Sequence, residues 1–424
     1  MALATPRLNA SGSQALSAYL KEVIKGRESP ATWIGATTAG GEIYLECAGE
    51  RVWGDEAKGS VSQDTMLQLF STTKLVTTIA ALQQVEQGKI GLDDSATLLK
   101  ICPELGKMQV LEGFGDDGKP QLRDARTEMT LRMLLNHTAG LTYAFSDANV
   151  ARYCQEVGTP QMWSPNAPIA AFVQPLAFDP GTRFRYGIGI DWAGIMVTRL
   201  SGLDLEVYFQ KYIWTPCAAK SMSFLPPRDW DQAGMAMTVR EPFHTGPVKL
   251  LEGTAMGRPM NPDEIGPVYM GGGGLFGTAR DYLAFLRGLL RSADPGTPDS
   301  ERLVQPDTFK LLFLDSIAEE HAPQIRKDIA TMAGNQHVHD PAILTGGTGE
   351  QVGYGPALLL NKVDSKFGRK AMSGFWDGAA KTYYWLDPTT GVAGICFTNL
   401  LSHNPDPFNE VFNRFERILY DHLE

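Results

Sequence analysis

A serine and a lysine lie three positions apart in Ser71-Thr72-Thr73-Lys74, within the stretch LFSTTKLVTTIAAL. Residues three apart in a helix are separated by about 60° around its axis, so the two side chains can share one face. A serine hydroxyl becomes a nucleophile when a base takes its proton, and a lysine whose pKa is lowered by burial can be that base. The spacing therefore indicates covalent catalysis, with N–H groups at the helix start available to an oxyanion.

The same four residues also have a purely structural interpretation. A serine at the start of a helix is most often an N-cap, and Ser-x-x-Lys occurs frequently by chance. The apolar residues Leu75, Ile79, Leu82 and Val85 share one stripe at helical spacing, which predicts a helix that opens at Ser71 and stops at Gly88. The motif alone does not establish an enzyme.

Two further segments carry residues that complement Ser71 and Lys74. FRYGIGIDWAG places Tyr186 in a glycine-flanked turn before a helix, where a phenol can be exposed, although most tyrosines simply pack. SGFWDGAAKTYYWLDP places Trp376-Asp377-Gly378-Ala379 before a strand. Glycine at position 378 allows close backbone approach, and the N–H that follows it, on Ala379, can act as a second oxyanion donor.

With these residues in this order, the sequence resembles the serine β-lactamase and penicillin-binding-protein fold, whose class C members carry S-x-x-K, Y-x-N and K-T-G. It resembles more closely the family VIII carboxylesterases, which use W-x-G as third motif, and is also similar to fungal acyltransferases of lovastatin-type polyketides. The segments MLLNHTAGLTYAF, GGGGLFGTARDYLAFLRGLL and TYYWLDPTTGVAG share this pattern. The resemblance runs from about Leu16 to the carboxyl terminus.

The resemblance implies a role for each matched residue. Ser71 would be the acylated nucleophile, Lys74 its general base, and Tyr186 the group that passes a proton to the leaving alkoxide. The N–H groups of Ser71 and Ala379 would form the oxyanion hole, and Trp376 would line the acyl pocket. No cofactor and no metal are implied.

Two departures from the β-lactamase motifs favour esters as substrates. Tyr186-Gly187-Ile188 lacks the asparagine that engages a β-lactam amide, and Trp376-Asp377-Gly378 lacks the lysine that receives its carboxylate. We therefore expect neutral esters, at most a weak β-lactamase side activity, and an acidic Asp377 that disfavours anionic acyl groups. Aromatic residues near the motifs favour apolar substrates, although some will belong to the core: Phe145, Tyr186, Trp192, Trp376 and Tyr383.

Other chemical patterns are set aside. Gly272-x-Gly274-x-x-Gly277 matches a dinucleotide fingerprint but follows no βαβ unit, so a glycine-rich wall beside the site is the better interpretation. His337-x-His339-Asp340 lacks the further histidine of a metallo-hydrolase ligand set. His137 is interpreted as a structural hydrogen-bonder. There is no G-x-S-x-G elbow, which disfavours an α/β-hydrolase.

The helices and strands expected around these residues indicate an α+β protein. Strands in Thr32–Val52 and in 381–400, with helices in about 13–26 and 407–423, predict an antiparallel sheet flanked by terminal helices. The expected domains are an α/β unit of residues 1–91 and 271–424, and a mainly helical insertion of residues 92–270, with the site in the cleft between them. A chain of 424 residues is long enough for both.

Composition excludes several function classes. A net charge of −10 without a basic cluster argues against nucleic acid and anionic membranes as partners. No apolar run approaches the roughly 20 residues of a membrane helix, and the first residues lack an apolar signal core. Five scattered cysteines fit reduced thiols, so we expect a cytoplasmic monomer or homodimer.

Three hypotheses about function follow. The first is a serine ester hydrolase in which water removes the acyl group from Ser71. The second is an acyltransferase in which a bound alcohol accepts the acyl group, and no motif distinguishes it from the first. The third is a binding protein that keeps the fold without turnover, which the three filled motif positions disfavour. A small-molecule ester is the expected partner in the first two, and an alcohol acceptor is a further partner in the second.

Overall fold

The computed structural model describes residues 5–27, 29–242, 246–252, 261–336, 350–402 and 406–424. Its helices are α1 (Ala10–Lys25), α2 (Thr73–Glu86), α3 (Ser95–Ile101), α4 (Leu131–Leu135), α5 (Ala148–Val157), α6 (Gly189–Ser201), α7 (Leu205–Phe209), α8 (Thr215–Cys217), α9 (Trp230–Ala233), α10 (Ala279–Ser292), α11 (Pro306–Leu311), α12 (Ala322–Gln336) and α14 (Pro407–Asp421). Its strands are β1 (Ala31–Thr38), β2 (Gly41–Gly49), β3 (Met66–Gln68), β4 (Val110–Phe114), β5 (Pro120–Arg123), β6 (Thr238–Arg240), β7 (Val248–Leu250), β8 (Phe276–Thr278), β9 (Val352–Tyr354), β10 (Leu359–Asn361), β11 (Ser373–Trp376), β12 (Tyr383–Asp387), β13 (Val392–Phe397) and β14 (Leu400–Leu401).

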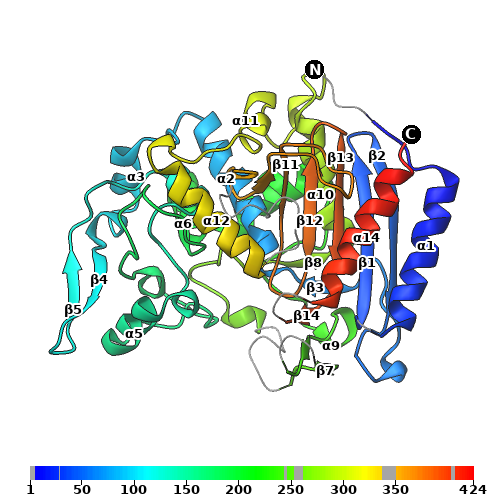
Figure 1. Ribbon diagram of the computed structural model, residues 1–424, viewed down its shortest axis with the longest axis horizontal. Coiled ribbons are helices and arrows are strands. Elements are labelled where there is room, and N and C mark those ends of the chain that lie inside the picture. The colour runs from blue at the N-terminus through cyan, green and yellow to red at the C-terminus, as the bar shows by residue number, and fades with distance from the viewer. Residues whose placement is uncertain (1–4, 28, 243–245, 253–260, 337–349, 403–405) are drawn as a thin grey trace.

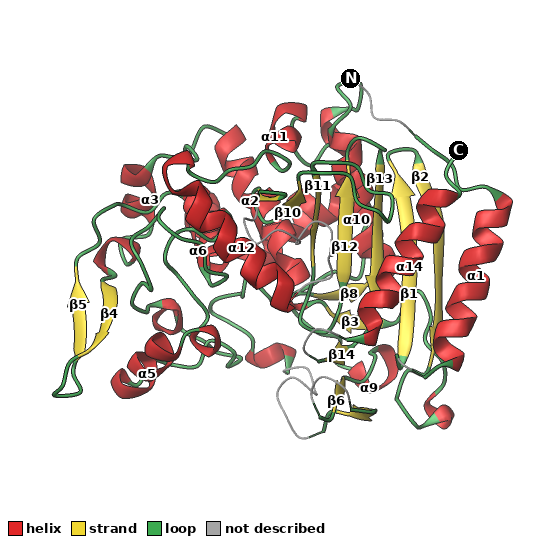
Figure 2. Ribbon diagram, in the orientation of Figure 1, coloured by secondary structure: helices red, strands yellow, loops and turns green. Residues whose placement is uncertain are grey.

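The main sheet joins the two ends of the chain. Its order is β2-β1-β13-β12-β11-β10-β9, and every neighbouring pair is antiparallel. The terminal helices α1 and α14 cover one face, and α10 lies behind the other (Figures 1 and 2). The predicted antiparallel sheet with flanking terminal helices is therefore confirmed.

Side chains that alternate along β12 pack against helices on both faces of the sheet. Trp385 contacts Phe412 of α14, with ring centroids 5.5 Å apart. Its neighbour Tyr384 points to the opposite face and contacts Tyr282 of α10, at 5.4 Å. Successive strand side chains point to opposite faces, so a strand that is apolar at every position must be covered on both sides.

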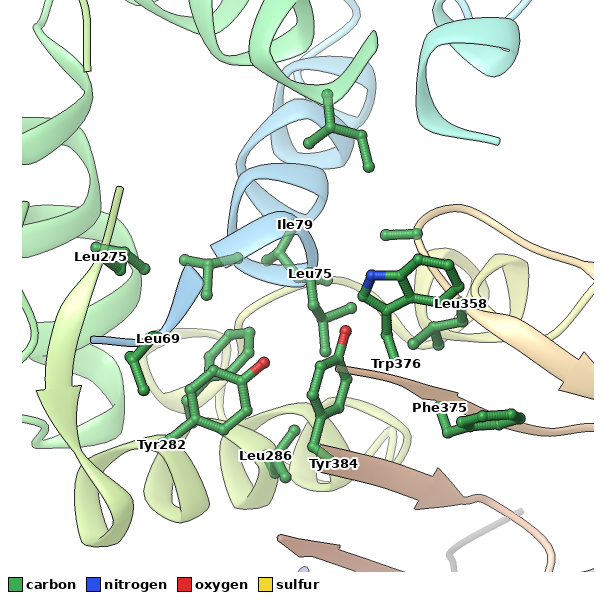
Figure 3. Packing of buried hydrophobic residues seen from close by; sticks show 14 of the residues in the cluster. Leu69, Leu75, Ile79, Leu275, Tyr282, Leu286, Leu358, Phe375, Trp376 and Tyr384 are labelled. Carbon is green, nitrogen blue, oxygen red and sulfur yellow. The ribbon is translucent and has the colours of Figure 1, made fainter. Parts of the chain in front are cut away.

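The centre of the molecule is occupied by α2. Leu75, Ile79 and Leu82 of the predicted stripe are buried, and so is every other residue from Thr73 to Gln84. Figure 3 shows Leu75 near Tyr384 and Trp376 of the sheet, with Tyr282 and Leu286 of α10 beneath. A helix surrounded by other elements has no solvent face, so polar residues on it serve contacts inside the protein.

Residues 92–270 contribute mostly helices, but not only helices. They also form the β4–β5 hairpin, and β6 and β7 of a small sheet whose third strand is β14. Contacts cross the predicted domain boundary, since Arg183 Nε pairs with Asp328 at 2.7 Å. The two-domain division therefore stays a prediction.

Several predicted elements are confirmed with small shifts in their ends. The predicted strands in 381–400 are β12 and β13, which flank the turn after Asp387, and the final helix begins at Pro407. Gly202, with a φ of 70°, ends α6 before α7 begins. No helix in the described ranges has both the length and the apolar character needed to cross a membrane.

Candidate active site

Ser71 lies in a tight turn that leads from β3 into α2. The turn is a 3₁₀ helix, Phe70–Thr72, and α2 itself begins at Thr73. Phe70 has a φ of +47°, a conformation that a side chain other than glycine rarely adopts. Backbone strain of this kind persists where the surrounding structure enforces it, and it is frequent at active sites.

The hydroxyl of Ser71 does not cap the helix. Neither the 3₁₀ turn nor α2 has a side-chain cap, and the hydroxyls of Thr72 and Thr73 donate to the carbonyls of Leu69 and Phe70, at 2.7 and 2.6 Å. The structural interpretation of Ser71 as an N-cap is therefore wrong, and so is the prediction that α2 opens at this residue.

Two candidate catalytic side chains meet at the Ser71 hydroxyl instead. Tyr186 donates from its hydroxyl to Ser71 Oγ at 2.6 Å, although it lies 115 residues further along the chain. Lys74 Nζ lies 3.3 Å from the same oxygen. The structure thus brings Ser71, Lys74 and Tyr186 into one hydrogen-bonded group, as their predicted roles require.

Lys74 is held by two acceptors besides Ser71. Its buried Nζ donates to the carbonyl oxygen of Gly272 at 2.7 Å and to the hydroxyl oxygen of Tyr143 at 2.9 Å. A carbonyl can only accept, and Tyr143 donates its own proton toward Asp191 at 3.5 Å. A neutral Lys74 amine therefore uses its two N–H groups there and directs its lone pair at Ser71.

Burial lowers the pKa of Lys74 to about 8, despite the opposing effect of the carboxylates of Asp191 and Asp377. Removing an ammonium group from water disfavours its charged form, and here this effect exceeds the attraction of the two carboxylates. Burial also raises the pKa of Tyr186, which keeps its phenol protonated and able to donate to Ser71. The electrostatics therefore favour Lys74 as the base and Tyr186 as the proton donor.

Tyr143 and Asp191 belong to the site but were not predicted as site residues. Asp191 is buried with a raised pKa, caused mainly by burial, and it accepts from the Gly272 N–H at 2.8 Å. A methyl group on Gly272 would lie 2.3 Å from Asp191 Oδ2, so only glycine fits between Asp191 and Lys74. The glycine run is thus a wall of the site, as expected. The buried acid within GIDWAG was the available signal for Asp191.

The loop after β11 is attached to the chain just before the nucleophile. A methyl group on Gly378 would lie 2.3 Å from the carbonyl oxygen of Leu69, and Thr382 donates its hydroxyl to that oxygen at 3.1 Å. Ala379 is exposed between the buried residues Gly378 and Ala380. This close approach supports the Ala379 N–H as an oxyanion donor, a role that stays a prediction.

Trp376 and Asp377 lie beside Tyr186 and Lys74. The Trp376 ring packs against Tyr186 with centroids 5.1 Å apart and is 1% exposed. Asp377 is half-buried, and its charge acts on the pKa values of both Lys74 and Tyr186. Their contact with a bound acyl group stays a prediction.

Of the other two predicted substrate-binding residues, Phe145 is exposed and Trp192 is buried. Phe145 is 73% exposed and stacks on Tyr143, with centroids 5.1 Å apart and an interplanar angle of 10°. Trp192 is fully buried in α6, where its indole N–H donates to the carbonyl of Phe172 at 3.0 Å. These contacts make Trp192 a packing residue of the helical region, and nothing in its described surroundings brings it to Ser71.

His137 holds the chain on both sides of Tyr186. Its carbonyl oxygen accepts from the Arg185 N–H at 3.0 Å, and its Nδ1 accepts from the Gly187 N–H at 3.4 Å. Its ring contacts that of Tyr186 edge-on at 4.8 Å. Burial lowers the pKa of His137 well below its usual range, so Nδ1 is available as an acceptor. The prediction of a structural hydrogen-bonder is confirmed, and its partners are the neighbours of the catalytic tyrosine.

We expect His137→Leu to lower kcat by about 10-fold or more, because the Gly187 N–H loses its acceptor and Tyr186 its fixed position. Tyr186→Phe should lower kcat by about 10²-fold. If His137 acts through Tyr186, the double variant will be no slower than Tyr186→Phe alone. His137→Asn keeps an acceptor and tolerates the φ of +60° at this position, so it should restore part of the rate. Additive losses in the double variant would contradict the positioning role.

We expect kcat/KM for a neutral ester to rise with pH and to level off above the Lys74 pKa of about 8. Lys74 accepts the Ser71 proton only when it is neutral, and the neutral fraction grows as pH rises through this value. Asp191→Asn removes a negative charge that raises the pKa of Lys74, so the midpoint should move to lower pH. Initial rates across the pH range measure both midpoints, with Asp117→Asn in an exposed turn as the control. An Asp191→Asn midpoint at or above that of the unmodified protein would contradict the assignment.

The residues considered as metal ligands and the cysteines form no second candidate site in the described ranges. His337, His339 and Asp340 lie outside the described residues. Within the described ranges, no three histidine, cysteine, aspartate or glutamate residues gather as metal ligands would. The five cysteines are free thiols.

The arrangement matches known proteins in both sequence and fold. A family model described as Beta-lactamase matches residues 35–416. The lovastatin esterase of Penicillium rubens is 32% identical over 378 residues, which covers 85% of this chain and 86% of the relative. A monacolin J acid methylbutanoyltransferase of Aspergillus terreus is 31% identical over 415 residues and covers 94% of both chains.

Solved structures agree. A variant of simvastatin synthase from Aspergillus terreus superposes with a TM-score of 0.81 at 29% identity, covering 97% of this chain and 95% of that one. EstCE1, a hydrolase with promiscuous acyltransferase activity, superposes with a TM-score of 0.70 at 18% identity, which shows a common fold. It covers 97% of this chain and 100% of that chain.

Proposed function

Because the chain belongs to the Beta-lactamase family, we propose that it is a serine ester hydrolase that forms an acyl-enzyme on Ser71 and acts on neutral, apolar esters. The observation that carries this proposal is the hydrogen-bonded group at Ser71 Oγ, which lies 2.6 Å from the Tyr186 hydroxyl and 3.3 Å from Lys74 Nζ. A serine between a proton acceptor and a proton donor is equipped for acyl transfer.

Acylation would use each group once. Neutral Lys74 takes the Ser71 proton as Oγ attacks the ester carbonyl carbon, and a tetrahedral oxyanion forms. As the bond between the carbonyl carbon and the alcohol oxygen breaks, Tyr186 donates its proton to that oxygen and regains one from Lys74. Deacylation reverses this path, with a second hydroxyl compound in place of the alcohol.

The oxyanion and the acyl group would be held by the segments around Ser71 and after β11. We assign the oxyanion hole to the N–H groups of Ser71 and Ala379, supported by the close approach of Gly378 to Leu69. We assign the near wall of the acyl pocket to Trp376, with Asp377 and Gly378 beside it. The charge of Asp377, which already acts on Lys74, disfavours an anionic acyl group here.

The relatives favour transfer to an alcohol as a second candidate function. One is named as an esterase and another as a methylbutanoyltransferase, although their identities to this chain are 32% and 31%. The two reactions share the acyl-enzyme and differ only in whether water or an alcohol removes the acyl group. A small-molecule ester is the substrate in both, and an alcohol acceptor is the further partner in the second.

One assay series tests the proposal. The protein is incubated with p-nitrophenyl esters of increasing acyl length, with and without added alcohols, and both phenol release and products are followed. Release in water supports hydrolysis, and release that requires an alcohol selects transfer. If no ester releases p-nitrophenol and the Ser71 peptide carries no mass adduct, both hydrolysis and acyl transfer are refuted.

The cellular location and the assembly state are part of the same proposal. Five free cysteines suit a reducing compartment, so we keep the cytoplasm as the proposed location. A monomer or a homodimer remains the proposed state.

A further inference from the structure

Two exposed aromatic side chains lie at the candidate site. Within the described ranges, Phe145 and Trp163 are the aromatic members of the exposed large hydrophobic residues, at 73% and 40% exposure. They come from different segments, since Phe145 lies in the 3₁₀ turn Ala144–Ser146 and Trp163 lies in the turn before the 3₁₀ helix Ile169–Phe172. Large aromatic groups left in water favour a ligand that covers them.

Both rings stack on one tyrosine of the site. The Phe145 and Trp163 centroids lie 5.1 and 6.1 Å from that of Tyr143, with interplanar angles of 10° and 24°. The hydroxyl of Tyr143 accepts from Lys74 Nζ at 2.9 Å. A group that stacks on this pair would therefore lie one ring away from the catalytic amine.

The glycine run leaves space between Trp163 and the nucleophile. A methyl group on Gly273 would meet Trp163 at 3.7 Å and the carbonyl carbon of Phe70 at 3.9 Å, which are ordinary contacts. That carbonyl carbon is bonded to the Ser71 nitrogen. The neighbouring position is closed, since a methyl group on Gly272 would overlap Asp191. Trp163 and the Phe70–Ser71 peptide thus lie on either side of Gly273, both within contact distance of a single added methyl group.

We propose that Phe145 and Trp163 form an aromatic stacking subsite for the alcohol part of the ester, selecting planar, apolar alcohols such as aryl or conjugated ring systems. This inference rests on the proposed function. We assign the subsite to the alcohol part of the ester because the alcohol oxygen must receive a proton from Tyr186 or Lys74. Tyr143, on which both rings stack, contacts Tyr186 and Lys74. The acyl side is assigned to Trp376, which also packs on Tyr186 but comes from β11, whereas Phe145 and Trp163 stack on Tyr143.

The test compares two esters with the same acyl group. Trp163→Leu and Phe145→Leu are each assayed on 2-naphthyl butanoate and cyclohexyl butanoate, with Leu314→Ala as the control because Leu314 is 54% exposed. Loss of one stacking partner should lower kcat/KM for the naphthyl ester by roughly 5- to 10-fold, mainly through KM. The cyclohexyl ester should change by less than about 2-fold, because a puckered ring stacks poorly. Equal losses for both esters, or no loss, would overturn the inference.

A second measurement separates this inference from the proposed function. Binding of 2-naphthol to the Ser71→Ala protein is followed by calorimetry, which needs no turnover. Weaker binding when Trp163→Leu is added supports the subsite, even if the unmodified protein hydrolyses no ester. Unchanged binding overturns the subsite, even if esters are hydrolysed. A change in selectivity among acyl groups and not among alcohols would overturn the assignment to the alcohol side.

Discussion

Ser71→Ala is expected to lower ester turnover by roughly 10⁴-fold or more and to abolish the mass adduct on the peptide that contains Ser71. Without the hydroxyl there is no atom that can be acylated, and Tyr186 and Lys74 lose the oxygen that they share at 2.6 and 3.3 Å. Because Ser71 does not cap α2, the substitution should leave the fold intact.

The measurement is single-turnover phenol release from a p-nitrophenyl ester, together with mass spectrometry of the acylated protein. Ser201→Ala is the control, since the Ser201 hydroxyl contacts only the nearby Leu203 backbone in the described hydrogen bonds. Turnover by Ser71→Ala at more than a trace would show that the nucleophile lies elsewhere.

Lys74→Met should lower the acylation rate by about 10³-fold, within the range for loss of a positioned base. Methionine has a similar length and no titratable group, so the buried position is filled while the base is lost. The pH dependence assigned to the Lys74 pKa of about 8 should disappear in the residual activity. Loss of this pH dependence is more specific evidence than a lower rate, because a packing defect would reduce the rate without removing the pH dependence.

The matched control is Lys89→Met, an exposed lysine just after α2 that donates to Gln84. It should retain the rate of the unmodified protein to within about 2-fold, as expected for an exposed side chain away from the site. If Lys74→Met kept most of its activity and its pH profile, the base would have to be reassigned, and Tyr186 would be the next candidate.

The candidate residues differ in how far they could be recognised from the sequence. Ser71 and Lys74 are three residues apart on one helical turn, so local geometry suffices to predict their contact. Tyr186 and the segment Trp376–Ala379 were assigned through their order and motif resemblance, because no local rule relates positions more than a hundred residues apart. The aromatic residues near the motifs are divided, as expected: Trp192 packs in the interior and donates to Phe172, whereas Trp376 packs on Tyr186.

Contacts across long sequence separations explain what was missed. Tyr143 lies 69 residues from Lys74, and its role depends on a hydroxyl that reaches a buried amine. Asp191 lies 81 residues from Gly272, to which it is hydrogen-bonded. His137 was predicted as a hydrogen-bonder, but its partners, the backbone N–H groups on both sides of Tyr186, were not. Tyr143 has no distinguishing sequence pattern, and the acid within GIDWAG does not by itself show that it reaches Gly272.

The available chemistry and the class of fold can be read from the order of residues: a serine and a lysine three positions apart, strands at both ends of the chain, and a helical middle. The direction of proton transfer depends on the folded structure. Burial of α2 on all sides lowers the pKa of Lys74 to about 8, and acceptors from Gly272 and Tyr143 direct its lone pair at Ser71. Desolvation and orientation depend on groups brought together by folding, so they cannot be derived from the local spacing of residues.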